Sequence, residues 1–352
     1  MSHRSLTFAA PPATPRRDRD ADRGYGAGAE PDWRAIDWRA HLHRVEVDGS
    51  PINYVDLGAG DRVDLGADRV DLGADRVDLG AGDREPVIFI HGLGGQWQNW
   101  LENLPRVAQE RRVLALDLPG FGLSPEPPWR TTIPAYGRTV SAFAARLGLD
   151  RVALVGNSMG GFITAETTIH DPARVTRLVL VSAAGISSAD TLRAPIITAG
   201  RVATALATNT AARHRELAAR PLSRHMSLAF VARHPRLLKP DFAYEGFFKG
   251  AGKPGLGVAL RACLEYDFRD RLPEVRVPTL IVWGQNDAII PVRDANEFER
   301  LIPDSRKVVM RDTGHVPMAE RPAAFNDVLL DFLAETGPAE EKERVAGESQ
   351  PA

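Results

Sequence analysis

The stretch from Val152 to Gly161 constrains the fold more than any other part of the chain. Four apolar residues, 152–155, lead through a glycine to Ser158, which has a glycine two residues away on each side. An uninterrupted apolar run is typical of a strand buried on both faces of a sheet. Helical spacing follows the serine as far as Asp171-Pro172. The stretch therefore predicts a strand, a tight turn that exposes the serine hydroxyl, and a helix, as in a nucleophile elbow.

The two groups that a serine nucleophile needs follow it in the order acid, then histidine. Asp287 comes directly after the apolar segment 279–284, and His315 comes soon after the apolar segment 307–310. The carboxyl ends of parallel strands meet at one edge of a sheet, so these side chains should converge with Ser158. We predict Ser158, Asp287 and His315 as the catalytic residues, acting as nucleophile, orienting acid and general base.

Other histidines and acids compete for these roles. Asp190 follows the apolar segment 178–182 and is an alternative acid. Six other histidines lie near an early strand or in arginine-rich helical stretches, and we expect them at the surface: His41, His43, His170, His214, His225 and His234.

A glycine-rich turn, His91 to Gly95, follows the apolar segment 87–90. Glycines let the backbone N–H groups of such a turn face the carbonyl oxygen of a substrate, where negative charge develops during acyl transfer. We predict the backbone N–H groups of Leu93 and Met159 as the oxyanion hole. The alternative is that the glycines only reverse the chain after a strand.

Five motifs together resemble the α/β-hydrolase fold over about residues 42–333: His91-Gly92, Asp117 to Ser124, Gly156 to Gly161, Gly284 to Asp287, and Gly314-His315. The resemblance implies a mostly parallel eight-stranded sheet with helices on both faces and a helical cap inserted after the sixth strand. A serine at the elbow argues against the haloalkane dehalogenases and epoxide hydrolases, which resemble this chain but use aspartate there.

Within that family, Asn157 and the Trp97-Gln98-Asn99 segment are similar to the meta-cleavage product hydrolases, which split carbon–carbon bonds. The chain departs from them where Val316 replaces a usual tryptophan and where the glycine turn lacks a proline. Asn157 could equally hydrogen-bond within the elbow. The residues predicted to contact substrate are Gly92, Asn99, Asn157, Phe247 and Val316.

The pattern of strands and helices predicts one catalytic domain with an insertion. We expect a disordered polar arm (1–40), a first core part (41–185), a helical cap (186–271), a second core part (272–336) and a disordered tail (337–352). Between Val55 and Arg84 the sequence Val-Asp-Leu-Gly occurs four times, which indicates a tandem expansion of a surface loop, assigned to 56–84. Calcium binding by these repeats is the alternative.

Composition excludes several classes of protein. The net charge of −2 over 352 residues does not favour nucleic acid. The only cysteine, Cys263, rules out an internal disulfide and is expected as a small buried helical residue. No histidine–cysteine cluster has metal-ligand spacing, and no segment is long and apolar enough to span a membrane. We expect a cytoplasmic protein without metal or cofactor that acts on a small molecule, either as a monomer or as a homodimer.

These observations predict a serine hydrolase that cleaves a small or medium carboxylic ester through an acyl-enzyme. Carbon–carbon bond hydrolysis is the second hypothesis. A non-catalytic ligand receptor of the same fold is the third.

Overall fold

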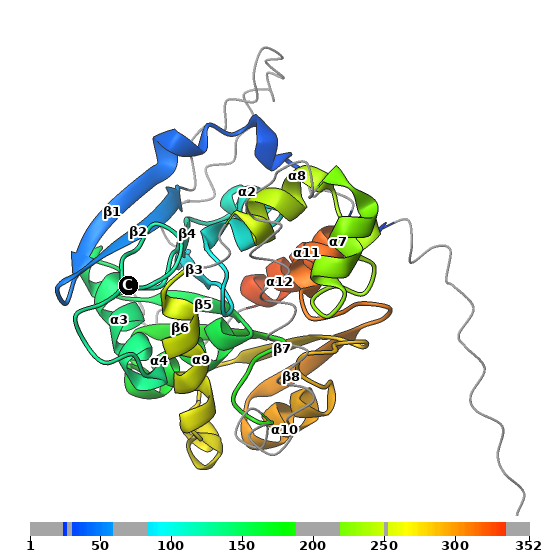
Figure 1. The fold of residues 1–352 in the computed structure, drawn as a ribbon. Helices are drawn as coiled ribbons and strands as arrows, with labels where there is room; N and C mark the ends of the chain where they lie inside the picture. The colour runs from blue at the N-terminus through cyan, green and yellow to red at the C-terminus, as the bar shows by residue number, and fades with distance from the viewer. Residues whose placement is uncertain (1–23, 27–29, 59–83, 188–218, 250–252, 336–352) are drawn as a thin grey trace, which may run out of the picture.

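Eight strands form one sheet in this computed structural model, which describes residues 24–26, 30–58, 84–187, 219–249 and 253–335. The strands are β1 (Leu42–Val47), β2 (Ser50–Leu57), β3 (Val87–Ile90), β4 (Val113–Leu116), β5 (Val152–Asn157), β6 (Val175–Val181), β7 (Thr279–Gly284) and β8 (Ser305–Met310). They lie in the order β1-β2-β4-β3-β5-β6-β7-β8 (Figure 1). β1 and β2 pair antiparallel, as do β2 and β4, and all other neighbours are parallel. The mostly parallel α/β fold is confirmed.

The first two strands form a hairpin through Asp48 and Gly49. Both residues have positive φ, 49° and 73°, and Val47 pairs directly with Ser50. An Asp-Gly pair in this conformation matches the twist of a two-residue hairpin. The hairpin therefore starts the sheet with an antiparallel edge before the parallel strands begin.

Successive residues of the inner strands point to opposite faces and bury two separate cores. In β3, Ile88 and Ile90 pack into one core and Val87 and Phe89 into the other, and all four are fully buried. The first core also contains side chains from α3 (Ile133–Arg146), α4 (Met159–His170), α9 (Gly255–Glu265) and α10 (Arg293–Leu301). The second contains side chains from α2 (Leu104–Ala108), α7 (Pro221–Leu228), α8 (Pro240–Phe242), α11 (Pro317–Glu320) and α12 (Pro322–Ala334). Burial on both faces explains why these strands are continuously apolar.

The described part of the segment between β6 and β7 contains helices joined by turns and irregular stretches, and no strand. Besides α7, α8 and α9 it contains the 3-10 helices η5 (Pro235–Leu237) and η7 (Arg269–Glu274) and the π-helix η6 (Ala243–Phe248). Residues 188–218 of the predicted cap lie outside the described residues. Cys263 is buried in α9 as expected, and burial raises the pKa of its thiol to about 12.

The prediction of a polar arm through residue 40 is wrong for its described part. The 3-10 helices η1 (Trp33–Ala35) and η2 (Trp38–His41) precede β1, and Trp33 and Ile36 are buried. Tyr25 is also buried, and Trp33 Nε1 donates a hydrogen bond to Glu102 Oε1 at 3.0 Å. Aromatic side chains here add apolar area to the core, which outweighs the polar character of the surrounding sequence. Residues 1–23 lie outside the described residues.

After the repeat segment, the chain rejoins the sheet next to an ion-pair contact. Glu85, two residues before β3, lies with Oε2 3.3 Å from Arg111 Nη1 and accepts a hydrogen bond from Arg177 Nη1. Both arginine side chains are buried. Residues 59–83, which hold most of the repeats, and the tail from 336 lie outside the described residues. Among the described helices, none is long and apolar enough to cross a membrane.

Candidate active site

The serine predicted as nucleophile occupies a strained turn between β5 and α4. Ser158 has φ 56° and ψ −118°, a conformation that residues with a side chain rarely adopt. Three backbone hydrogen bonds hold it there. Its N–H donates to Val181 O at 2.9 Å, and its carbonyl accepts from Ala184 N at 2.9 Å and from Phe162 N at 3.2 Å. Neighbouring β6 thus fixes the turn, and strain held in this way is typical of functional sites.

The glycines around the serine are required by close backbone contacts. A Cβ on Gly156 would lie 2.3 Å from Gly160 O, and a Cβ on Gly160 would lie 2.3 Å from Ile90 O. A Cβ on Gly161 would lie 2.6 Å from the Cβ of Ala183. Helix α4 therefore approaches β3 and β5 more closely than side chains would allow.

Asp287 and His315 meet at the carboxyl edge of the sheet, as the sequence predicts. His315 Nδ1 lies 2.8 Å from Asp287 Oδ2. The other carboxylate oxygen, Oδ1, accepts hydrogen bonds from the backbone N–H groups of Ile289 and Ile290 at 2.8 and 2.9 Å. The Asp287 side chain is fully buried and the His315 side chain is 6% exposed. Because a carboxylate only accepts, Nδ1 carries the proton and Nε2 is the ring nitrogen that can accept one.

Backbone contacts tie the histidine to both sides of the site. His315 N donates to Val231 O of the insertion at 2.8 Å. Asn157 Nδ2 donates to His315 O at 3.3 Å and to Val181 O at 3.1 Å. The amide of Asn157 is thus engaged within the elbow, which supports the structural alternative for this residue; its predicted contact with substrate stays a prediction.

The glycine-rich turn passes beside the serine. Gly95 N donates to Gly92 O at 3.0 Å, and a Cβ on Gly92 would lie 3.1 Å from Ser158 Cβ. Met159 begins α4, and the first N–H groups of a helix have no acceptor within it. Positive potential at that helix end favours an anion. The turn and the helix start that carry Leu93 and Met159 therefore flank the serine on neighbouring strand ends.

His91 supports the turn rather than serving as a base. Its Nδ1 lies 2.7 Å from Gly92 O, and its Nε2 lies 3.0 Å from the Leu118 N–H, which donates to it. This pattern fits the neutral ring with its proton on Nδ1. Burial lowers the pKa of His91 to about 4.

Asp117 is a supporting residue that the sequence did not single out, although it begins one of the family motifs. Its carboxylate accepts hydrogen bonds from Trp97 N at 2.8 Å, Leu123 N at 2.9 Å and Asn53 Nδ2 at 2.8 Å. Burial raises its pKa to about 6, although these hydrogen bonds lower it. A Cβ on Gly122 would lie 2.1 Å from the carboxyl carbon, so the motif needs its glycine for this contact.

Three residues predicted to contact substrate have structural contacts. Asn99 is buried, and its Nδ2 donates to Gly246 O of the π-helix η6 at 2.5 Å. Phe247 of η6 packs edge-to-face on Phe242 with ring centroids 5.6 Å apart. Val316 is buried at the start of α11. Their roles toward a ligand stay predictions.

The competing residues do not converge on Ser158 in the described part of the chain. His234, expected at the surface, is half-buried with Nε2 2.8 Å from Asp312 Oδ2. His43, His170 and His225 are exposed. The alternatives His214 and Asp190 lie outside the described residues. Among described residues, no group of three or more His, Cys, Asp or Glu side chains could hold a metal ion.

A family model described as the alpha/beta hydrolase fold matches residues 85–322, which include the elbow, Asp287 and His315. The chain belongs to this family.

Relatives in the family differ in what their names say they act on. The chain is 32% identical over 249 residues to the "Dihydrolipoyllysine-residue acetyltransferase component of acetoin cleaving system" of Pseudomonas putida, a match that covers 70% of this chain and 63% of that relative. It is 31% identical over 259 residues to "Putative carbamate hydrolase RutD" of Escherichia coli O7:K1 (strain IAI39 / ExPEC), covering 72% of this chain and 92% of the relative. The CarC enzyme, a serine hydrolase involved in carbazole degradation, has a similar solved structure, with 25% identity and a TM-score of 0.57 over 83% of this chain and 99% of that one.

Proposed function

We propose that this chain is a serine hydrolase that cleaves a small or medium carboxylic ester through an acyl-enzyme on Ser158. The observation that carries the proposal is the contact between His315 Nδ1 and Asp287 Oδ2, beside a serine held at positive φ. A buried carboxylate at Nδ1 fixes the ring tautomer, which leaves Nε2 to take the serine proton.

The proposed reaction has two steps. In the first, His315 Nε2 takes the proton of the Ser158 hydroxyl while the serine oxygen attacks the substrate carbonyl, and the same proton then goes to the leaving alcohol. The N–H groups of Leu93 and Met159 stabilise the oxyanion. In the second step His315 activates a water molecule that hydrolyses the acyl-enzyme and releases the acid.

The relatives support acyl chemistry more broadly than one substrate. A carbamate, as in the name of the E. coli relative, and an acetyl group, as in the name of the P. putida relative, both present a carbonyl carbon to a nucleophile. We propose the ester as the first substrate class to test, with the helical insertion 186–271 as the cap that selects the acyl group.

Carbon–carbon hydrolysis has less support than ester hydrolysis. The residues that suggested it hold the fold together: the Trp97 N–H is bonded to Asp117, and Asn99 is bonded to the insertion. Asn157 is bonded to Val181 and His315. A receptor without catalysis is also less favoured, because such a protein has no need for a carboxylate bonded to His315.

The test compares wild type with Ser158→Ala on p-nitrophenyl esters of graded chain length and on a coloured ring-fission dienoate. We expect ester turnover to fall by several orders of magnitude in the variant, together with loss of labelling by a fluorophosphonate. Ser141→Ala is the matched control, because that hydroxyl bonds to Asp171 in another part of the fold. Full turnover by Ser158→Ala would refute the proposal, and dienoate cleavage without ester cleavage would establish carbon–carbon hydrolysis instead.

A further inference from the structure

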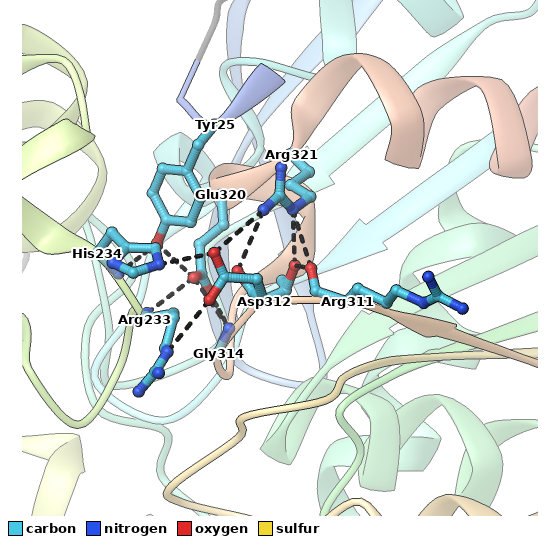
Figure 2. A network of polar contacts seen from close by, with 9 residues as sticks. Tyr25, Arg233, His234, Arg311, Asp312, Gly314, Glu320 and Arg321 are labelled. Atoms are coloured by element: carbon cyan, nitrogen blue, oxygen red, sulfur yellow. Dashed lines mark hydrogen bonds and ion pairs between the residues drawn. The ribbon is translucent and has the colours of Figure 1, made fainter. Parts of the chain in front are cut away.

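A buried carboxylate outside the predicted catalytic set holds the loop of His315. Glu320 is the last residue of α11, five residues after the histidine, and it is fully buried. Figure 2 shows side chains and backbone groups from the amino-terminal segment, the insertion and the histidine loop around it.

The carboxylate binds the backbone N–H groups of the residues before and after His315. Its Oε1 accepts hydrogen bonds from Gly314 N at 2.9 Å and from Val316 N at 3.2 Å, and its Oε2 lies 2.9 Å from Gly314 N. A Cβ on Gly314 would lie 3.0 Å from Oε1 and 2.8 Å from Arg233 N, so this grip requires glycine before the histidine. One carboxylate thus holds the peptide group between His315 and Val316 and the peptide group between Thr313 and Gly314, so the backbone is held directly after the histidine and one residue before it.

The same carboxylate connects this loop to the insertion and to the amino-terminal segment. Oε2 accepts a hydrogen bond from Arg233 N at 2.8 Å and another from the Tyr25 hydroxyl (Figure 2). Tyr25 in turn accepts a hydrogen bond from His234 N at 2.8 Å, and Gly26 N donates to Glu320 O at 2.7 Å. The donors to the carboxylate are three backbone N–H groups and one phenol, all of them neutral.

An outer layer of charges closes over this cluster. Asp312 has φ 47° and lies with its carboxylate 2.8 Å from His234 Nε2 and 3.3 Å from Arg233 Nε. Arg321 lies over the Tyr25 ring, 5.3 Å from its centroid, and donates to Thr313 Oγ1 at 2.9 Å. Glu320 is therefore sealed beneath the residues that lead into the histidine loop.

Burying a carboxylate whose hydrogen-bond donors are all neutral has a large desolvation free-energy cost. Burial raises the pKa of Glu320, whereas the hydrogen bonds from Tyr25, Arg233, Gly314 and Val316 lower it. An amide or an apolar side chain would fill the space at a smaller desolvation cost. Among side chains, however, only a carboxylate can accept four or five hydrogen bonds at once.

We propose that Glu320 is a positioning residue for His315, and that Tyr25 completes its hold. The inference rests on the proposed function, in which His315 is the base. Loss of the hold would let the imidazole shift relative to Ser158, and a displacement of about 1 Å in a catalytic group costs up to about 100-fold in rate.

The test uses the full chain and the variants Glu320→Gln and Tyr25→Phe. An amide at position 320 puts an NH2 group against N–H donors, so we expect kcat and the rate of fluorophosphonate labelling to fall by about 10- to 100-fold, with KM changed by less than about two-fold. Glu102→Gln is the matched control, because Glu102 is a buried carboxylate that accepts from Trp33 Nε1. A merely structural role would lower the melting temperature in both Gln variants and leave kcat of the folded protein unchanged.

Folded Glu320→Gln with the kcat and labelling rate of wild type would overturn the inference. If that variant does not fold, Tyr25→Phe decides, since it removes one donor and leaves the backbone contacts. We expect kcat to fall by about 2- to 10-fold at unchanged KM, and an unchanged kcat would overturn the inference. Failure of the proposed function would give a different result. Ser158→Ala would then retain full turnover, whether or not the Glu320 variant loses activity.

Discussion

Asn157 Nδ2 donates a hydrogen bond to the carbonyl oxygen of His315, 3.3 Å away, so the residue before the elbow serine is bonded to the backbone of the predicted base. The same amide donates to Val181 O at 3.1 Å. Strand β5, strand β6 and the histidine loop are joined at this point. Asn157, which stands next to the serine, is therefore one of the residues that fix Ser158 and His315 relative to each other.

Replacing Asn157 with alanine should loosen this junction. We expect the free energy of unfolding to fall by about 1–3 kcal/mol, because buried acceptors lose their donor, and labelling of Ser158 by fluorophosphonate to slow. Asn326→Ala is the control, since Asn326 is equally buried but bonds Glu102 O through its amide. Denaturant unfolding and labelling rates check both. Slower labelling in the control as well would show that the effect is general destabilisation.

Replacing Asp287 with asparagine should preserve the fold and remove most activity. An Asn Oδ1 can still accept from Ile289 and Ile290, but its NH2 group faces His315 Nδ1 and favours the wrong ring tautomer. We expect kcat to fall by about 10,000-fold. Steady-state kinetics measures this, with Asp294→Asn as the control, because Asp294 is a buried carboxylate that accepts from Ser187 N. Activity within about ten-fold of wild type would exclude Asp287 as the orienting acid.

Replacing Gly156 with alanine should displace the elbow. Its new methyl group would lie 2.3 Å from Gly160 O, and backbone atoms cannot yield cheaply, so we expect about 1–3 kcal/mol of lost stability and a large loss of Ser158 labelling. Gly257→Ala is the control. Nothing lies within 4 Å of a Cβ there, and Gly257 is inside α9, where alanine is favoured by roughly 0.5–1 kcal/mol. Thermal melts of the two variants should shift in opposite directions, and equal melts would contradict the contact.

His91 and Asp117 should give opposite pH dependence to stability. The pKa of His91 is lowered from 6.5 to about 4, so the free energy of unfolding that it contributes is lost as the pH falls from 6.5 toward 4. The pKa of Asp117 is raised from 3.8 to about 6, so its contribution is lost as the pH rises through 6. Each shift corresponds to roughly 3 kcal/mol, and the two largely offset between these limits.

Single variants should expose the two opposed contributions. We expect Asp117→Asn to lose stability more steeply than wild type on acidification from pH 6.5 to 4, and His91→Asn to gain relative to wild type over the same range. Urea unfolding at several pH values measures how the free energy of unfolding changes with pH. This slope does not depend on the pH-independent loss of stability that each substitution causes. Parallel slopes in all three proteins would show that neither group titrates in this range.

Local patterns were sufficient to predict the sheet and the order of the site residues. Apolar runs end shortly before Ser158, Asp287 and His315, and in a parallel sheet the position after a strand end already determines which edge a side chain reaches. The glycines around the serine were predictable for the same reason, since strand, turn and helix lie within a few residues of each other.

Contacts between distant segments could not be predicted in this way. Tyr25 and Glu320 are 295 residues apart, and nothing in the spacing of either residue indicates the other. The buried part of the amino-terminal segment was missed because Tyr25, Trp33 and Ile36 stand among glycines, a proline and charged residues, with no apolar run between them. The bond between Asn99 Nδ2 and Gly246 O of the π-helix η6 also joins residues 147 apart, which no local spacing indicates.

Glu85 fixes the position at which the chain rejoins the sheet after the repeats. Arg111 and Arg177, which hold this residue, both lie outside the repeats, so we expect β3 to begin at the same residue in forms with fewer or more Val-Asp-Leu-Gly units. Adding or removing whole units costs little closure entropy. We therefore expect forms of this protein with different repeat numbers to share the same sheet and the same elbow around Ser158.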